Sequence, residues 1–386
     1  MLASAASASA ADPGRWTETG RSTIPLYYYQ GVSSDPMRDL FFNGVDVGLY
    51  RTDPNLNEKA RNDDVIPPAV HVAEQYNHIG DITWDEREGG RVLLPLECYY
   101  PKAAPGRPDE NNTCETGSIG VADPQTLQWR YYVKLDPAEI PKVMWAEDSP
   151  DGKLLWTQSG NDLLAYSMDE IKAANAAPLG PKLKAVRKLV NAKPPSGITG
   201  AVFLGGRLYV AGQQDTTFQV WSIDLDTGER RLEIEKKVVG ESEGLDVFEG
   251  LGGTLHWLIQ PYNEQTVPTY GAANGTLLHF VPRGQKPSTA PARPSRVRLA
   301  IVPRRIRAGR RTRLRFKATA FVAGSYKPAG GVAIRLGSRH AVTSARGIAR
   351  MTVRIRRPGR YFAYARRADL RRGSARITVT RPRPRR

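Results

Sequence analysis

TGAVFLGGRLYVAGQQDTTFQVWSID, residues 199–224, contains three short apolar runs separated by turn residues. Gly200 opens the first run, Gly205-Gly206 separates it from RLYVAG, and the third run ends in Asp224. Runs of this length, bounded by Gly and Asp, are typical of strands joined by tight turns. The stretch therefore predicts an antiparallel sheet that cannot hide both of its faces alone.

The same pattern recurs about five times between residues 30 and 281. The units open at Gln30-Gly31, Gly80-Asp81, Ala146-Glu147, Thr199-Gly200 and Glu243-Gly244, and the third strand ends in Asp53, Asp123, Asp169 or Asp224 in four of them. Four-stranded propeller blades need roughly 40 to 45 residues, and radial stacking buries the faces between them. We predict an all-β, five- or six-bladed β-propeller. Residues 16–29 would close either a sixth, degenerate blade or the fifth.

In strand pattern and turn chemistry, residues 16–281 resemble the propellers of the gluconolactonase, strictosidine-synthase-like and NHL-repeat type. The resemblance includes no diagnostic catalytic motif. In the gluconolactonase-like family a Glu-Gly pair opens a blade and its Glu is a metal ligand, which makes Glu243-Gly244 the similar pair here. The other ligands of that family have only loose counterparts in this sequence.

The residue that opens each unit is expected on an innermost strand, near the propeller axis. These channel-lining residues are Gln30, Asp81, Glu147, Thr199 and Glu243, with His78 nearby. Oxygen ligands suit calcium, so Glu243, Glu147 and Asp81 form a candidate metal site, and calcium is the one cofactor that this pattern suggests. The alternative is that these polar residues cap inner strands and bind channel water.

Charge divides the chain into an acidic body and a basic tail. From Arg293 onward there are 29 Lys or Arg and one acid, Asp369, which gives a net charge of +28 against −11 for residues 1–292. In TRLRFKATAF and RMTVRIRR, apolar and basic residues alternate, which predicts a sheet with one buried and one wet face. The number and length of the strands resemble bacterial immunoglobulin-like domains. Turns are expected at Pro358-Gly359 and Arg372-Gly373.

These patterns give the following expected domain organisation. Residues 1–15 are a signal-peptide remnant or disordered tail, 16–281 the propeller, 282–295 a Pro/Ser/Ala-rich linker, 296–381 a basic immunoglobulin-like β-sandwich, and 382–386 a basic tail. No stretch approaches the roughly 20 apolar residues that a membrane-spanning helix requires.

Two cysteines, Cys98 and Cys114, flank a polar, proline-broken insertion. With no His cluster nearby, a disulfide is favoured over zinc, and a disulfide indicates an oxidising compartment. Inside the insertion, Tyr99 and Tyr100 are candidates for stacking on a ligand such as a sugar; the alternative is that they pack within a blade.

Two functions remain open from the sequence. The first is a secreted or envelope-associated propeller that binds an extracellular ligand, with the basic sandwich as spacer or tether to anionic envelope polymers. The second is a calcium-dependent hydrolase or lactonase acting in the central channel. The body has no GxSxG elbow, P-loop or GxGxxG, so an enzyme is the less favoured class. We expect a monomer without sequence-specific nucleic-acid binding.

Overall fold

The computed structural model of this chain divides into two compact units. The described residues are 15–28, 30–35, 39–44, 47–87, 90–98, 114, 116–174, 182–260, 274–285, 297–322, 325–367 and 370–381. One unit comprises Met1–Glu86 and Gly90–Pro291, and the other Ala292–Arg386 together with Arg87–Gly89. Strands dominate both units, so the predicted all-β class is confirmed.

The described residues of the first unit form five antiparallel sheets, four of them from consecutive strands. The first sheet contains β2 (Gly31–Ser34), β3 (Leu40–Asn43), β4 (Leu49–Thr52) and β5 (Glu58–Asn62); the second β6 (His78–Ile79), β7 (Thr83–Asp85), β8 (Arg91–Glu97), β9 (Ser118–Ala122) and β10 (Trp129–Lys134). The third contains β11 (Glu147–Asp148), β12 (Leu154–Ser159), β13 (Asp162–Ser167) and β14 (Arg187–Leu189); the fourth β15 (Gly200–Leu204), β16 (Arg207–Gln214), β17 (Thr217–Ile223) and β18 (Arg230–Lys237).

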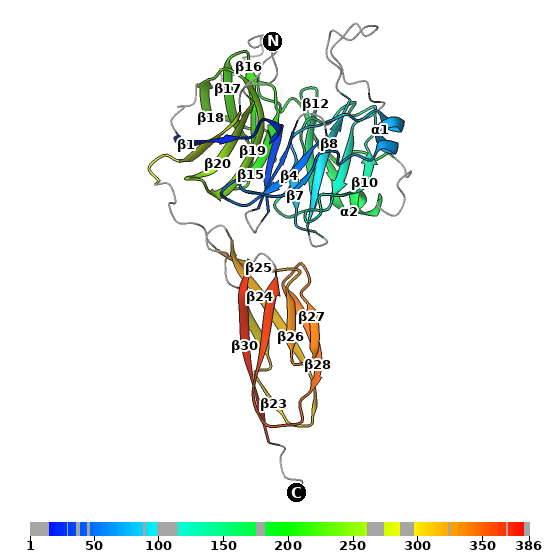
Figure 1. The fold of residues 1–386 in the computed structure, drawn as a ribbon, viewed down its shortest axis with the longest axis vertical. Helices are drawn as coiled ribbons and strands as arrows, with labels where there is room; N and C mark the ends of the chain where they lie inside the picture. Colours follow the sequence, from blue (N-terminus) through cyan, green and yellow to red (C-terminus); the bar gives the residue numbers. More distant parts are fainter. Residues whose placement is uncertain are drawn as a thin grey trace, which may run out of the picture. The chain divides into compact units, whose positions relative to one another are not determined.

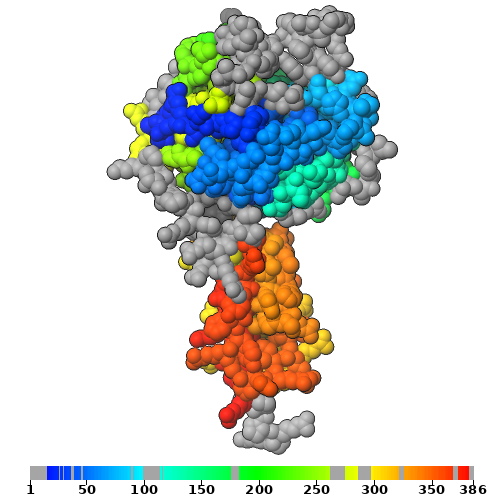
Figure 2. Space-filling model, in the orientation of Figure 1, coloured from blue at the N-terminus to red at the C-terminus, as the bar shows by residue number. Residues whose placement is uncertain are grey.

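The fifth sheet contains strands from both ends of the unit's sequence. It contains β19 (Glu241–Gly250), β20 (Gly253–Gln260) and β21 (Gly275–Pro282), and its fourth strand is β1 (Trp16–Ile24), which pairs antiparallel with β21. Figures 1 and 2 show β1 in dark blue beside the yellow-green strands from the far end of the unit. The first strand therefore closes the fifth sheet and not a sixth.

The inner strands of the five sheets contact one another in a ring. β2 contacts β7 and β19, β11 contacts β7 and β15, and β15 contacts β19. The hydrophobic cores repeat this order, because each core joins two consecutive sheets. One core joins Phe42 and Tyr50 of the first sheet to Leu258 and Leu277 of the fifth. Radially stacked sheets of this kind form a propeller-type fold.

The Asp that ends the third strand of a unit is explained by the turn that follows it. Asp224 Oδ1 accepts hydrogen bonds from the main-chain N–H groups of Asp226 and Thr227, each at 3.0 Å. Asp123 accepts the equivalent bonds in its own turn, and Asp53 accepts from the residues two and four positions ahead. Asp side chains favour turns through such contacts. Asp169 differs, because it lies in the first turn of helix α2 (Met168–Ala173), which Ser167 caps.

Besides α2, the described part of this unit contains the 3-10 helix η1 (Leu26–Tyr28) and the helix α1 (Pro68–Glu74). None of the helices in the described residues has the length and apolarity that a bilayer crossing requires.

A chain of hydrogen bonds through two histidines links all four strands of the fifth sheet. His256 Nε2 lies 2.9 Å from Phe248 O, His256 Nδ1 lies 2.9 Å from His279 Nδ1, and His279 Nε2 lies 2.8 Å from Ser22 Oγ. Both rings are buried. Burial lowers the pKa of His256 to about 3 and that of His279 to about 4. A neutral imidazole ring has one N–H donor and one acceptor nitrogen. Each ring in this chain makes one hydrogen bond of each kind, so both rings can be neutral.

Acidification is expected to destabilise the propeller through this pair. Unfolded histidines take up protons near pH 6.5, whereas the buried pair stays neutral, so its contribution to stability is full above pH 6.5 and is lost as pH falls toward 4. Urea unfolding at pH 7 and pH 4.5 should show that His256→Gln/His279→Gln removes a pH-dependent loss on the order of 5 kcal/mol, because each of the two rings contributes about two pKa units at pH 4.5. The exposed His340→Gln is the control. An unchanged pH dependence in the double variant would exclude this origin.

The second unit is a sandwich of two sheets (Figure 1). One sheet contains β22 (Arg298–Val302), β24 (Arg311–Val322), β25 (Ser325–Pro328) and β28 (Ile348–Arg354). The other contains β23 (Arg305–Arg307), β30 (Leu370–Thr380), β29 (Gly359–Arg367), β26 (Ala333–Leu336) and β27 (Arg339–Val342). Their apolar faces enclose one core, which includes Leu314, Phe316, Met351 and Val353.

The predicted alternation holds in this sandwich, but one predicted turn is wrong. Along β24, Leu314, Phe316 and Ala318 are buried, as the period-two pattern requires. Arg372-Gly373, expected to form a turn, lies inside β30 instead. The β29–β30 pairing runs from Gly359↔Val379 to Arg367↔Leu370, which places the reversal before this dipeptide.

Candidate functional site

The propeller axis is narrow because glycines of the inner strands lie against neighbouring main chains. A Cβ atom added to Gly244 would lie 2.6 Å from Val32 N and 2.9 Å from the Cα atom of Gly31. One added to Gly200 would lie 2.5 Å from Glu243 O. Gly200 and Gly244 therefore allow this close approach of the inner strands, which a larger residue at either position would obstruct.

Asp81, which lies on the inner side of the second sheet, joins it through side-chain hydrogen bonds to the first, fourth and fifth sheets. The inner strand of the second sheet is interrupted between β6 and β7, and at this break Asp81 N donates to Met144 O at 2.9 Å. Its carboxylate accepts main-chain N–H bonds from Val32 at 3.0 Å, Ala201 at 3.0 Å and Leu245 at 3.4 Å. Burial raises the pKa of Asp81 well above its usual value, and the three N–H bonds oppose this rise.

Glu147 has a similar role between the second, third and fourth sheets. Its Oε2 accepts from Thr83 Oγ1 at 2.6 Å, and its Oε1 accepts from Phe203 N at 3.2 Å. Burial also raises the pKa of Glu147 well above its usual value. Asp81 and Glu147 are thus clamps between inner strands.

Glu243 belongs to a different group of polar side chains. The side-chain amide nitrogen of Gln260, turned toward the two acids, donates to Glu243 Oε1 at 3.2 Å and to Glu241 Oε2 at 3.0 Å. Burial raises the pKa of Glu243 well above its usual value, with further contributions from Glu241, Asp81 and Glu97. Glu97 Oε1 in turn lies 3.3 Å from His78 Nδ1.

The other two predicted channel residues also lie at the ends of inner strands. Gln30 is buried directly before β2, and its main-chain N–H donates to Asn43 O at 3.0 Å. Thr199 Oγ1 lies 3.0 Å from Ser242 Oγ. In the described part of the chain, no group of three or more His, Cys, Asp or Glu side chains is arranged to hold a metal ion. Metal binding by Glu243, Glu147 and Asp81 stays a prediction.

Asp246 on β19 is an axial acid that the sequence analysis missed. Its carboxyl group is buried, and within the described residues its Oδ2 has no hydrogen-bond partner. Burial raises the pKa of Asp246 to about 6, although hydrogen bonds from Ser34 and Val247 oppose the rise. This group is therefore suited to exchanging a proton near neutral pH. The only sequence signal is an acid within the otherwise apolar run GLDVF.

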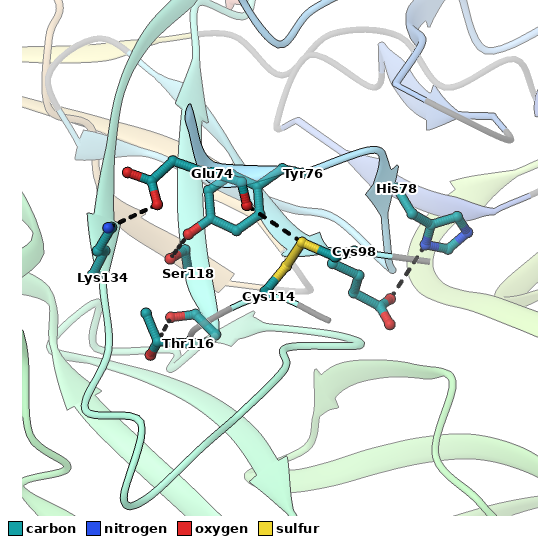
Figure 3. The surroundings of a disulfide bond; sticks show 10 residues. Glu74, Tyr76, His78, Cys98, Cys114, Thr116, Ser118 and Lys134 are labelled. Carbon is teal, nitrogen blue, oxygen red and sulfur yellow. Dashed lines mark hydrogen bonds and ion pairs between the residues drawn. A yellow bond between two sulfur atoms is a disulfide. The ribbon is translucent and has the colours of Figure 1, made fainter. Parts of the chain in front are cut away.

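The predicted disulfide is confirmed between Cys98 and Cys114 (Figure 3). Cys98 Sγ lies 3.5 Å from Glu74 O, at the end of α1. The Glu74 carboxylate accepts from Tyr132 OH at 2.8 Å and pairs with Lys134 Nζ at 2.7 Å, both on β10. The disulfide thus joins β8 to the segment before β9, beside a polar contact between α1 and β10. Tyr99 and Tyr100, the predicted stacking residues, lie outside the described residues.

No protein-family model and no curated protein matches the chain. Among solved structures, a gluconolactonase from Xanthomonas campestris is 14% identical, with 70% of this chain and 95% of that chain covered and a TM-score of 0.40. A glutaminyl cyclase from Myxococcus xanthus is 11% identical, with 70% and 98% covered and a TM-score of 0.42. A WD40-repeat structure is 7% identical, with 67% and 97% covered and a TM-score of 0.36. The chain is similar to these proteins over about two thirds of its length.

Proposed function

We propose that this protein is a five-bladed β-propeller joined to an immunoglobulin-like sandwich, and that the sandwich attaches it to anionic polymers of a cell envelope. Each of the five sheets is one blade, with β1 as the outer strand of the last blade. The chain order of the sandwich supports the immunoglobulin-like assignment. β22 and β24 lie in one sheet. β23, which lies between them in the chain, belongs to the other sheet and pairs in parallel with β30, the last strand of the chain.

The observation that carries the attachment role is the placement of arginines across β24 and β28. In the antiparallel pairing, Arg311 lies directly opposite Arg354, and Arg315 directly opposite Arg350. All four side chains are exposed. Like charges in directly opposed positions destabilise a sheet, and the sole acid of the sequence from Arg293 onward is Asp369. A bound polyanion would neutralise this repulsion and release its own counterions.

The propeller is then the part that recognises an extracellular ligand. The disulfide supports an oxidising location. The alternative, a calcium-dependent hydrolase, would need axial carboxylates that are free to take a cation. The positive ends of main-chain N–H groups face Asp81 and Glu147 instead, so the axial geometry favours a binding protein.

Retention on immobilised polyphosphate and on DNA across a salt series tests the attachment role. The full-length protein should bind both, lose affinity steeply as salt rises, and not distinguish DNA sequences. A sandwich variant with Arg311, Arg315, Arg350 and Arg354 changed to Gln should bind less tightly at every salt concentration and show a shallower salt slope.

The control variant loses four positive charges from the propeller instead. Its changed residues, each replaced by Gln, are Arg21, Lys153, Lys184 and Lys188. All four of these side chains are more than half exposed, so little stability is lost. Equal binding by the two variants, or no binding by the unaltered protein at low salt, would refute the attachment role.

A further inference from the structure

The sandwich contains a cavity of about 500 Å³ where the chain crosses from one sheet to the other. Leu299 and Ile301 of β22 line it on one side, and Ala375 and Thr378 of β30 on the other. This volume lies within the range of small-molecule sites, roughly 300–1,000 Å³. The cavity belongs to the sandwich alone and shares no residue with the axial carboxylates.

Three arginines, Arg304, Arg305 and Arg376, complete the lining. The strand pairing holds them in place. Arg305 is the register partner of Thr378, and Thr378 N donates to Arg304 O at 2.8 Å. Arg376 lies two residues before Thr378 on β30, and the strand period of two places both residues on the same face of the sheet. The cavity and its basic residues are thus part of the regular fold.

The sequence around the three arginines of this cavity offers almost no acidic residue to pair with them. From Arg293 onward the sole acid is Asp369, which is not among the lining residues. All three arginine side chains are exposed, so solvent screens most of their mutual repulsion, and an anion bound among them neutralises the rest. Arg presents a planar fork of N–H donors that matches the oxygens of a phosphate, often with two parallel bonds.

The rest of the lining indicates what the anion is attached to. Leu299, Ile301 and Ala375 are apolar; Ile301 is buried in the core of the sandwich, whereas Leu299 and Ala375 pack against that core and stay partly exposed. A ligand whose phosphate faces the arginines and whose carbon skeleton covers the apolar side would satisfy both parts of the cavity. We propose that this cavity binds a phosphate ester, with Arg304, Arg305 and Arg376 holding the phosphate group.

This inference extends the proposed attachment role, because an envelope polymer with phosphate esters would present such a group at each repeat. It differs from the attraction of polyanions by the exposed arginines of β24 and β28, because a cavity is saturated by one ligand per chain. The two claims therefore fail separately.

Calorimetric titration of the full-length protein with phenyl phosphate and with inorganic phosphate tests the cavity. Phenyl phosphate should bind with a stoichiometry of one and more tightly than inorganic phosphate, because only the ester contacts the apolar side. The variant Arg304→Gln/Arg305→Gln/Arg376→Gln should bind phenyl phosphate at least about tenfold more weakly, which is about 1.4 kcal/mol.

The matched control is Arg335→Gln/Arg339→Gln/Arg346→Gln, which removes the same charge from exposed positions of the same sandwich. It should bind phenyl phosphate within about twofold of the unaltered protein, because charges outside the cavity act only through solvent. A charge-neutral variant, Ala375→Leu, narrows the cavity and should weaken phenyl phosphate more than inorganic phosphate. Equal losses in the two triple variants, or no saturable binding by the unaltered protein, would overturn the proposal.

Competition identifies the source of the ester. Displacement of phenyl phosphate by a glycerol-phosphate polymer but not by equimolar glycerol 1-phosphate would assign the cavity to a polymer; the reverse would assign it to a free ester. Loss of polyphosphate retention in the β24–β28 variant, with phenyl phosphate binding intact, would show that the two sites act independently.

Discussion

Replacing Arg91 with methionine is expected to lower the free energy of unfolding of the propeller by about 3–5 kcal/mol. Arg91 is fully buried, its Nε lies 2.5 Å from Asp85 Oδ2, and its Nη1 donates to Tyr131 OH at 2.6 Å. Asp85 is fully buried as well. Removing the guanidinium would take away the positive charge that this buried carboxylate pairs with, which costs far more than the lost attraction alone. Urea unfolding followed by circular dichroism measures the change.

Two further variants separate this effect from the loss of any arginine. Arg130 pairs with Asp123 at 2.6 Å but is partly exposed, so Arg130→Met should cost no more than about 1 kcal/mol. Asp85→Leu/Arg91→Met removes both charges and should recover much of the stability, because a well-packed apolar pair often replaces a buried ion pair without loss. A double variant as unstable as Arg91→Met would contradict the explanation by the loss of this ion pair.

Changing Gly244 to alanine is expected to be the second severe substitution, with a cost of at least about 3 kcal/mol. The new methyl group would lie 2.6 Å from Val32 N and 2.7 Å from Asp81 Oδ1. Neither atom is the end of a flexible side chain, since the Asp81 carboxylate is held by main-chain N–H groups. The inner strands would have to separate, and the hydrogen bonds to Asp81 would lengthen.

Gly197→Ala is the control for this substitution. The nearest atom to its added Cβ is Gln213 O at 3.8 Å, an ordinary contact distance. Thermal melts should show less than about 1 kcal/mol of change for this variant. If the two variants melt at the same temperature, the main chains at the axis are not packed as closely as described.

The sheets of the propeller could be predicted from the sequence because their signals are local. Gly205-Gly206 has positive φ angles of 59° and 84°, a conformation that Gly adopts without strain. Asp224 bonds to residues only two and three positions ahead. Each such turn is specified by neighbours in the chain, so it can be recognised without knowing the fold. The placement of the unit openings on inner strands followed from the same repeat.

The roles of the axial acids could not be predicted, because their partners are far away in sequence. Asp81 meets main-chain N–H groups of Val32, Ala201 and Leu245, and an N–H group is present at nearly every position of any chain. Residue identity therefore does not distinguish a clamp from a metal ligand. The same holds for Arg91, whose burial depends on how β8 packs and not on its own sequence context.

The pairing of β1 with β21 has a consequence for how the protein is made. Trp16 is the register partner of Pro282, so β1 leaves the ribosome long before β21, the strand with which it pairs. At about 5–20 residues per second, that interval is on the order of tens of seconds. Until then β1 has no strand to pair with, and an unpaired strand invites association with other chains. The nascent chain therefore depends on being kept apart from its neighbours until synthesis has passed the end of β21.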